Sequence, residues 1–276
     1  MGIATMSWSG GIAEWVENDT AFISVAFSWK LPEAYQRAVW HKSSGKSVRV
    51  GGGGVFYHRD YFNGVAEYGG KVDALPHHNP DATKASEGCP VGCYFCTVPH
   101  IEGRDFTLLP DFTPRPILCD NNLSALPEDY QDYIVQKYID SGVQLLDANS
   151  GFEPSSFYEE TYQRWKKINN GAWRFAFDEM VEERYVKRMT EILKGEPASS
   201  KRVYVLIGNE PIENCLYRIN RVIEWGCEPH VQPIMALNTL EKKPMVKFDW
   251  TEHKLQQMAR WANRWLWRSM PFEAYK

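Results

Sequence analysis

Three cysteines crowd into one short stretch, "GCPVGCYFC" at residues 88–96, of a 276-residue chain that has six cysteines in all. Cys89, Cys93 and Cys96 follow the spacing C-x3-C-x2-C, which is too compact for an independent disulfide framework. The spacing therefore indicates ligation of a metal ion or an iron–sulfur cluster. A cubane cluster has four irons, so three thiolates leave one iron open to another ligand.

A structural zinc site is the alternative that the same residues leave open. Such a site takes four protein ligands, and the other cysteines, Cys119, Cys215 and Cys227, stand alone in the sequence. The fourth ligand would then be a histidine close to the cysteines, and the candidates are His77, His78 and His100. On this interpretation the chain is a non-catalytic protein that binds zinc or an iron–sulfur cluster.

The stretch "CPVGCYFC" resembles the signature of the radical S-adenosylmethionine (radical SAM) superfamily, C-x3-C-x-aromatic-C, with Phe95 as the aromatic residue. The resemblance implies that Cys89, Cys93 and Cys96 bind three irons of a [4Fe–4S] cluster, and that S-adenosylmethionine (SAM) chelates the fourth. It further implies an external electron donor such as flavodoxin or ferredoxin. Reductive cleavage of SAM would then give a 5′-deoxyadenosyl radical that abstracts hydrogen from a substrate.

The elements that must position these cysteines are predicted by apolar stretches that alternate with helical ones. Five apolar stretches after the cysteines each precede a segment with helical features, and they lie at 115–120, 143–148, 173–178, 202–208 and 230–237. With one more strand near "ATKASEG", about six βα units fit. This alternation predicts an α/β fold with a parallel sheet and right-handed crossovers. We expect a partial (β/α)6 TIM-like barrel, open because eight units do not fit.

Polar residues end four of these predicted strands, at the edge where the ligand-binding loops of a parallel sheet converge. We predict from this position that the cofactor-binding residues include Asp120, Asn121, Asn122, Asp147, Asn149, Asp178, Gly208 and Glu210. Asp120 to Asn122 stand where the radical SAM superfamily has a Gly-Gly-Glu segment, although that tripeptide is absent. The segment "YVLIGNEPIE" is similar to the superfamily's adenine-binding turn. Because Asp and Asn after a strand also cap helices, an ordinary capping role stays open for each residue.

Residues 1–80 predict a small α/β unit that precedes the barrel at residues 81–276. A strand in "TAFISVAFSW", a helix in "LPEAYQRAVWHKSSG" and a strand in "KSVRVGGGGVF" form a βαβ unit, and the glycines at 51–54 predict a tight turn. This segment resembles a shortened form of the amino-terminal domain of cobalamin-dependent radical SAM proteins and methylthiotransferases. Because the sequence D-x-H-x-x-G is absent, we expect the unit to cover the substrate opening without holding a corrinoid.

The carboxyl-terminal stretch from residue 252 predicts an amphipathic helix with Arg260, Arg264 and Arg268 on one face. We expect its apolar face to close the open side of the barrel. We expect the arginines to be solvated or paired with carboxylates, and the alternative is that they bind a polyanionic substrate through its phosphates. The resemblance of residues 1–80 to methylthiotransferases implies a nucleotide or nucleic acid as substrate, and a peptide or small metabolite is the alternative. The net charge of −4 gives no overall attraction for a polyanion. No apolar run is long enough for a membrane helix, and the first residues lack the features of a secretory signal. We therefore expect a cytoplasmic protein without a membrane partner.

Overall fold

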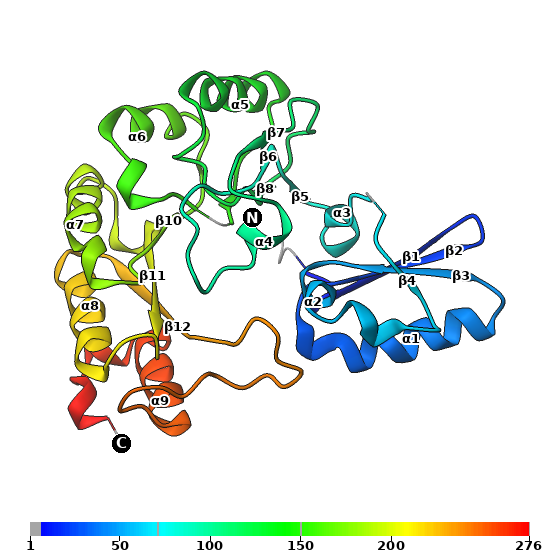
Figure 1. The fold of residues 1–276 in the computed structure, drawn as a ribbon. Coiled ribbons are helices and arrows are strands. Elements are labelled where there is room, and N and C mark those ends of the chain that lie inside the picture. The colour runs from blue at the N-terminus through cyan, green and yellow to red at the C-terminus, as the bar shows by residue number, and fades with distance from the viewer. Residues whose placement is uncertain (1–6, 71, 150, 276) are drawn as a thin grey trace.

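A computed structural model describes residues 7–70, 72–149 and 151–275, and its strands fall into two units (Figure 1). The first unit is a four-stranded sheet in the order β1-β2-β3-β4. Its strands are β1 (Ile12–Glu17), β2 (Thr20–Val25), β3 (Ser47–Gly51) and β4 (Glu67–Tyr68). β1 and β2 form an antiparallel hairpin, whereas β2, β3 and β4 run parallel.

The predicted βαβ unit is present as β2, the helix α1 (Leu31–Ser43) and β3. Pro32 occupies the first turn of α1, where its missing N–H would have no helical partner. Leu31, Ala34 and Ala38 bury one side of α1 against the sheet. The strand β1 was not predicted, and its sequence signal is weak because half of its residues are exposed.

The glycine run forms a tight turn, as predicted, between β3 and the short helix α2 (Gly53–Phe56). Gly52 has a φ angle of +93°, and a Cβ atom placed on it would lie 2.5 Å from the carbonyl oxygen of Val25. Only glycine combines this backbone conformation with such a close approach. The turn after β3 is thereby pressed against the end of β2.

The second unit contains six parallel strands in two three-stranded sheets, with the orders β5-β8-β9 and β10-β11-β12. The strands are β5 (Ala82–Thr83), β8 (Ile117–Leu118), β9 (Asp147–Ala148), β10 (Trp173–Ala176), β11 (Lys201–Ile207) and β12 (Glu228–Pro233). Each falls within or overlaps a predicted strand, and neighbours in the sheets are consecutive among these six. The α/β class and the parallel pairing are therefore confirmed.

Five helices follow the strands from β8 onward and lie along the outer side of the two sheets (Figure 1). They are α5 (Glu128–Ser141), α6 (Glu159–Trp165), α7 (Glu183–Ile192), α8 (Ile212–Glu224) and α9 (Glu252–Asn263). In β11, Val203, Val205 and Ile207 are fully buried on the helix side, whereas the alternate residues are only partly buried. No helix within the described ranges is both long and apolar enough to cross a membrane.

Between the two units the chain forms α3 (Leu75–His78). A loop follows, and the two strands at its ends pair with each other as a short hairpin. The hairpin strands are β6 (Ser86–Glu87) and β7 (Thr107–Leu108), and the short helix α4 (Val98–Ile101) lies between them. Buried apolar side chains form two separate clusters, one within residues 12–62 and one within residues 85–262. The domain boundary near residue 80 stays a prediction, and it falls between these clusters.

The carboxyl-terminal helix is shorter than predicted. α9 ends at Asn263, and Trp265 takes a left-handed conformation with a φ angle of +54°. Short 3-10 turns at Leu266–Arg268 and Phe272–Ala274 follow. The three arginines therefore do not form one helical row, because only Arg260 belongs to α9.

Candidate metal and cofactor site

The three cysteines lie in a loop whose two ends are joined by strand pairing. β6 and β7 close it through the antiparallel pairs of Ser86 with Leu108 and of Glu87 with Thr107. Inside the loop, the Cys89 amide donates to the Gly103 carbonyl at 3.3 Å, and the Cys96 amide donates to the Cys93 carbonyl at 3.0 Å. These backbone bonds therefore restrict the loop that carries the cysteines.

Glu102 and Asn121 hold the start of this cysteine loop. The Glu102 Oε2 atom accepts hydrogen bonds from the Gly88 amide at 3.0 Å and from Asn121 Nδ2 at 2.6 Å. Asn121 Nδ2 also donates to the Gly88 carbonyl at 3.2 Å. A Cβ atom on Gly88 would lie 2.2 Å from the Asp105 carbonyl oxygen, so the position requires glycine. Glu102 was not predicted, because no spacing in the sequence marks it.

Asp120 binds the segment before the cysteine loop, and Asn122 contacts the first cysteine. Asp120 is 1% exposed, and its oxygens accept hydrogen bonds from the Ala85 amide at 2.9 Å and from the Ser86 hydroxyl. These bonds fix the segment that leads into the cysteine loop. Asn122 Nδ2 lies 3.9 Å from Cys89 Sγ and donates to it. Each residue of the predicted segment 120–122 therefore contacts the cysteine loop or the residues just before it. Their contacts with SAM stay a prediction.

The thiols and their surroundings suit a positively charged group. Burial first, and then the neighbouring Cys96 and the carboxylate of Asp178, raise the pKa of Cys93 to about 12. Burial also raises the pKa of Cys96, whose Sγ atom accepts a hydrogen bond from the Val98 amide at 3.4 Å. Thiolates in this anionic surrounding need a compensating cation, which the irons of a cluster would supply. The donor set therefore fits an iron–sulfur cluster.

Two of the histidines named for a zinc site are engaged elsewhere. His77 stacks on Trp15 with a ring-centroid distance of 3.9 Å, and His78 Nε2 lies 2.9 Å from the Ser24 hydroxyl. His100 lies on α4, within the cysteine loop. Within residues 7–70, 72–149 and 151–275, no three His, Cys, Asp or Glu side chains are placed to hold a single metal ion. A cubane cluster makes a different demand, because each thiolate binds a different iron.

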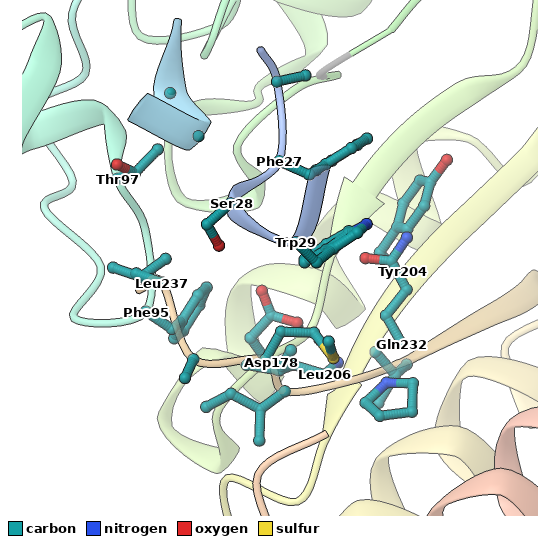
Figure 2. A pocket seen from close by; sticks show the side chains of 18 residues that line it. Phe27, Ser28, Trp29, Phe95, Thr97, Asp178, Tyr204, Leu206, Gln232 and Leu237 are labelled. Atoms are coloured by element: carbon teal, nitrogen blue, oxygen red, sulfur yellow. Dashed lines mark hydrogen bonds between the residues drawn. The ribbon is translucent and has the colours of Figure 1, made fainter. Parts of the chain in front are cut away.

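A cavity of about 420 Å³ lies between the two units (Figure 2). The amino-terminal unit lines it with Ala26, Phe27, Ser28, Trp29, Gly53 and Gly54. The second unit lines it with Phe95, Thr97, Asp178, Tyr204, Val205, Leu206, Gln232 and the segment 233–237. The residues after β2 and β3 thus face the carboxyl ends of β10, β11 and β12. The four-stranded sheet and the β10-β11-β12 sheet thus both face the cavity with the carboxyl ends of their parallel strands, where parallel sheets bind ligands.

Asp178 is the one predicted cofactor residue that lines the cavity. Its Oδ1 atom accepts a hydrogen bond from the Leu206 amide at 2.9 Å, and its backbone carbonyl accepts one from Asn209 Nδ2 at 2.6 Å. Burial raises the pKa of Asp178 to about 6, and hydrogen bonding to Leu206 opposes that shift. The side chain is thus fixed at the junction of β10 and β11.

Gly208 and Glu210 lie behind the cavity and do not line it. Gly208 has a φ angle of +89°, and a Cβ atom on it would lie 3.1 Å from side-chain atoms of Ile234 and Leu255. Glu210 Oε2 lies 3.1 Å from a guanidinium nitrogen of the fully buried Arg218. Both residues therefore shape the turn after β11, and their contact with SAM stays a prediction.

Asp147 and Asn149 are brought together by Arg174, a residue that was not predicted. Asp147 Oδ2 forms an ion pair with Arg174 at 2.8 Å, and the side-chain oxygen of Asn149 accepts from the same guanidinium at 3.4 Å. Arg174 also donates to the Tyr204 hydroxyl at 3.1 Å. Val203 and Val205 alternate with Arg202 and Tyr204 in the sequence of β11, and this period of two is the signal that could have revealed Tyr204 on the opposite face.

The segment from β12 to α9, residues 234–250, is called the strap here because it reaches across to the amino-terminal unit (Figure 1). The Ser28 hydroxyl donates to the Thr239 carbonyl, and His58 Nε2 lies 2.8 Å from the Asn238 carbonyl oxygen. The carboxyl-terminal helix was expected to close the barrel. The strap reaches the cavity instead, whereas no residue of α9 lines it.

Comparison with known proteins finds similar folds among solved structures. No family model and no curated protein sequence matches the chain. Among solved structures, the fold is similar to the radical S-adenosylmethionine methyltransferase TsrM from Kitasatospora setae, whose structure holds cobalamin and a [4Fe–4S] cluster. The TM-score is 0.57 at 10% sequence identity, and the match covers 79% of this chain and 64% of TsrM. The chain thus spans less than two thirds of TsrM, and what the match establishes is a fold similar to that of a radical SAM enzyme.

Proposed function

We propose that the chain is a radical SAM enzyme in which Cys89, Cys93 and Cys96 hold a [4Fe–4S] cluster. The observation that carries the proposal is a fastened C-x3-C-x-Phe-C loop beside a cavity, on a fold similar to that of a radical SAM enzyme. These cysteines would hold the cluster, and a cluster reduced by a donor such as flavodoxin or ferredoxin would supply the electron for reductive cleavage of SAM and so for hydrogen abstraction from a substrate. In this proposal the two parallel sheets form the open (β/α)6 TIM-like barrel.

The carboxylates near the cysteines suit the charge of SAM, which carries an ammonium and a sulfonium group. Asp178 lines the cavity, and the negative charges of Asp178 and Glu153 both raise the pKa of the Cys93 thiol. Negative side chains attract cationic groups most strongly where water is limited, as it is around the buried Asp178. These residues would orient SAM, and Phe95 would pack beside it from the cysteine loop.

The cavity favours a small metabolite as substrate. Its volume of about 420 Å³ and its largely apolar lining fall within the roughly 300–1,000 Å³ range of small-molecule sites. Arg268 pairs with Glu228 at 3.0 Å, at the amino end of β12, whereas the cavity lies at the carboxyl end beside Pro233. None of Arg260, Arg264 and Arg268 is among the residues that line the cavity, which supports a small metabolite over a nucleic acid.

The amino-terminal unit and the strap would keep water away from the reacting groups. Phe27 and Trp29 stack with a ring-centroid distance of 4.7 Å and form one wall of the cavity. The strap contributes Met235, Ala236 and Leu237 to the lining. Apolar walls of this kind protect a reactive intermediate from side reactions with solvent.

Anaerobic reconstitution followed by incubation with SAM and dithionite tests the proposal. We expect about four irons and four sulfides per chain and release of 5′-deoxyadenosine. Cys93→Ala should lose both the cluster and the product. Cys227→Ala is the matched control, because Cys227 is 2% exposed within the hydrophobic core, and it should retain both. Stoichiometric zinc without iron uptake would instead support the structural zinc interpretation.

A further inference from the structure

We infer that Arg218, a fully buried arginine on α8, is a positioning residue that holds Asp178 at the cavity wall and offsets the negative charge around it. The inference rests on the proposed function, in which Asp178 orients SAM. Arg218 does not line the cavity itself, so it acts through Asp178 and makes no contact with a ligand there.

Arg218 ties together the two backbone segments that hold Asp178. One nitrogen of its guanidinium donates to the Phe177 carbonyl at 2.5 Å, and another donates to the Leu206 carbonyl at 2.9 Å. Phe177 directly precedes Asp178 in the chain, and the Leu206 amide donates to Asp178 Oδ1 at 2.9 Å. A single side chain of α8 therefore fixes the end of β10 relative to the end of β11.

Asn209 forms a second connection between Arg218 and Asp178. Its side-chain oxygen accepts from Arg218 at 3.3 Å, and its side-chain nitrogen donates to the Asp178 carbonyl at 2.6 Å. Asp178 and Leu206 both line the cavity (Figure 2). A change at Arg218 thus reaches the cavity wall through hydrogen bonds to both the carboxylate and the backbone of Asp178.

Asp178 lies among other carboxylates. Glu182 Oε2 accepts from the Asp178 amide at 2.6 Å. Burial is the main reason that the pKa of Asp178 is raised to about 6, and the charges of Glu153 and Glu179 act in the same direction. Burial is also the main reason that the pKa of Glu182 is raised to about 7. An ionised Asp178 therefore needs a compensating positive charge nearby.

Arg218 supplies that positive charge. Against the effect of burial, the Leu206 hydrogen bond and the charge of Arg218 lower the pKa of Asp178, and Arg218 has the largest effect among the charged side chains. On the cysteine loop, burial first and then nearby carboxylates raise the pKa of Tyr94, and Arg218 opposes them. The guanidinium also pairs with Glu210 at 3.1 Å. Without Arg218, more of Asp178 would be protonated and unable to attract the cationic groups of SAM.

Calorimetry of SAM binding to the reconstituted full chain, between about pH 5.5 and pH 8.5, tests this role. In the wild type, SAM affinity should fall as pH drops through about 6, because Asp178 takes up a proton. Arg218→Gln should move this midpoint up by about one pH unit, which weakens binding about threefold at pH 6.5, with a smaller loss above pH 8. Arg218→Lys keeps the charge and should restore the midpoint. Arg221→Gln is the matched control, because Arg221 lies on the same helix and pairs with Glu183 and Glu224.

Two further variants separate this role from a role in folding alone. Arg218→Gln combined with Glu210→Gln leaves neither charge buried without its partner, and the midpoint should still rise, because Arg218 has the largest effect on Asp178 among the charged side chains. Asp178→Asn should remove the midpoint near pH 6. Arg218→Gln added to Asp178→Asn should then cause no pH-dependent change.

An unchanged midpoint in the variants without Arg218, an equal loss of affinity at every pH, or the same shift in Arg221→Gln would overturn the inference while the proposed function stands. If the wild type does not bind SAM, the proposed function fails. Carbon NMR of the Asp178 carboxyl in the purified full chain, assigned with Asp178→Asn, then decides the inference. Its pKa should rise by about one pH unit in Arg218→Gln, and an unchanged pKa would overturn the role of Arg218.

Discussion

The side-chain amide of Asn122 donates to Cys89 Sγ across 3.9 Å, and the rest of this side chain is fixed by the loop that follows. Its oxygen accepts hydrogen bonds from the Ala125 amide at 3.2 Å and the Ser124 hydroxyl at 3.4 Å. Asn122 is 3% exposed, so the amide has little freedom to turn away. A predicted cofactor residue thus contacts a predicted cluster ligand directly.

Replacing Asn122 should change the reduction potential of the cluster. An N–H donor stabilises the added negative charge of the reduced cluster, so Asn122→Leu should lower the potential, by about 20–40 mV for a weak hydrogen bond. Redox titration monitored by electron paramagnetic resonance, without SAM, measures the shift. Asn149→Leu is the control, because Asn149 makes the same 3.9 Å contact with Cys119, which lies outside the cysteine loop. Equal shifts in both variants would contradict a specific role for Asn122.

Asp120 should make stability depend on pH. Burial raises its pKa from 3.8 to about 6. Between these values the folded chain keeps a proton that the unfolded chain has lost, so the free energy of unfolding falls as pH rises, by on the order of 3 kcal/mol. Asp120→Asn should flatten this dependence in urea denaturation between about pH 4 and pH 7. The exposed Asp140→Asn serves as control, and parallel profiles for wild type and Asp120→Asn would refute the assignment.

The strap should loosen when its contacts with the amino-terminal unit are removed. Ser28→Ala combined with His58→Leu removes the hydrogen bonds to Thr239 and Asn238. We expect faster hydrogen exchange in residues 234–250 and little change in the core strands, because these contacts join the strap to the amino-terminal unit and involve no core strand. Hydrogen exchange with mass spectrometry measures this. His253→Leu, at an exposed position of α9, is the control, and unchanged exchange in the double variant would show that other contacts hold the strap.

The arginines near the carboxyl terminus should not bind substrate. Replacing Arg260, Arg264 and Arg268 with glutamine should leave substrate-free SAM cleavage and oligonucleotide binding at low salt unchanged, because Arg268 lies at the end of β12 away from the cavity. Product formation and fluorescence anisotropy measure the two quantities. A loss of oligonucleotide binding with cleavage retained would instead restore a nucleic-acid substrate.

The amino-terminal unit should function without a corrinoid. TsrM has cobalamin bound, but no histidine lines the cavity of this chain among its described residues. We expect purified protein to lack corrinoid absorption and added cobalamin to keep the spectrum that it has in buffer. Co-purified cobalamin, or a spectral change on mixing, would contradict this expectation.

What the sequence could predict was set by local patterns. The cysteine spacing, the six parallel strands and α1 follow from signals within a few residues, such as apolar runs and Pro32 at a helix start. The end of α9 could not be predicted, because Trp265 turns left-handed without a glycine to mark it. Glu102 and Arg174 could not be predicted either, since their partners are up to 30 residues away and are set by tertiary packing and strand register.

The hairpin of β6 and β7 has a consequence for assembly. Gathering three thiols from a freely moving loop would cost conformational entropy at the moment of metal binding. Here the hairpin, the Glu102 and Asn121 contacts and the Gly88 turn have already restricted the loop. Cluster loading therefore resembles binding to a preorganised chelator, and the protein differs from small metal-dependent domains that fold only around their metal. The apo chain should fold first and take up its cluster afterwards.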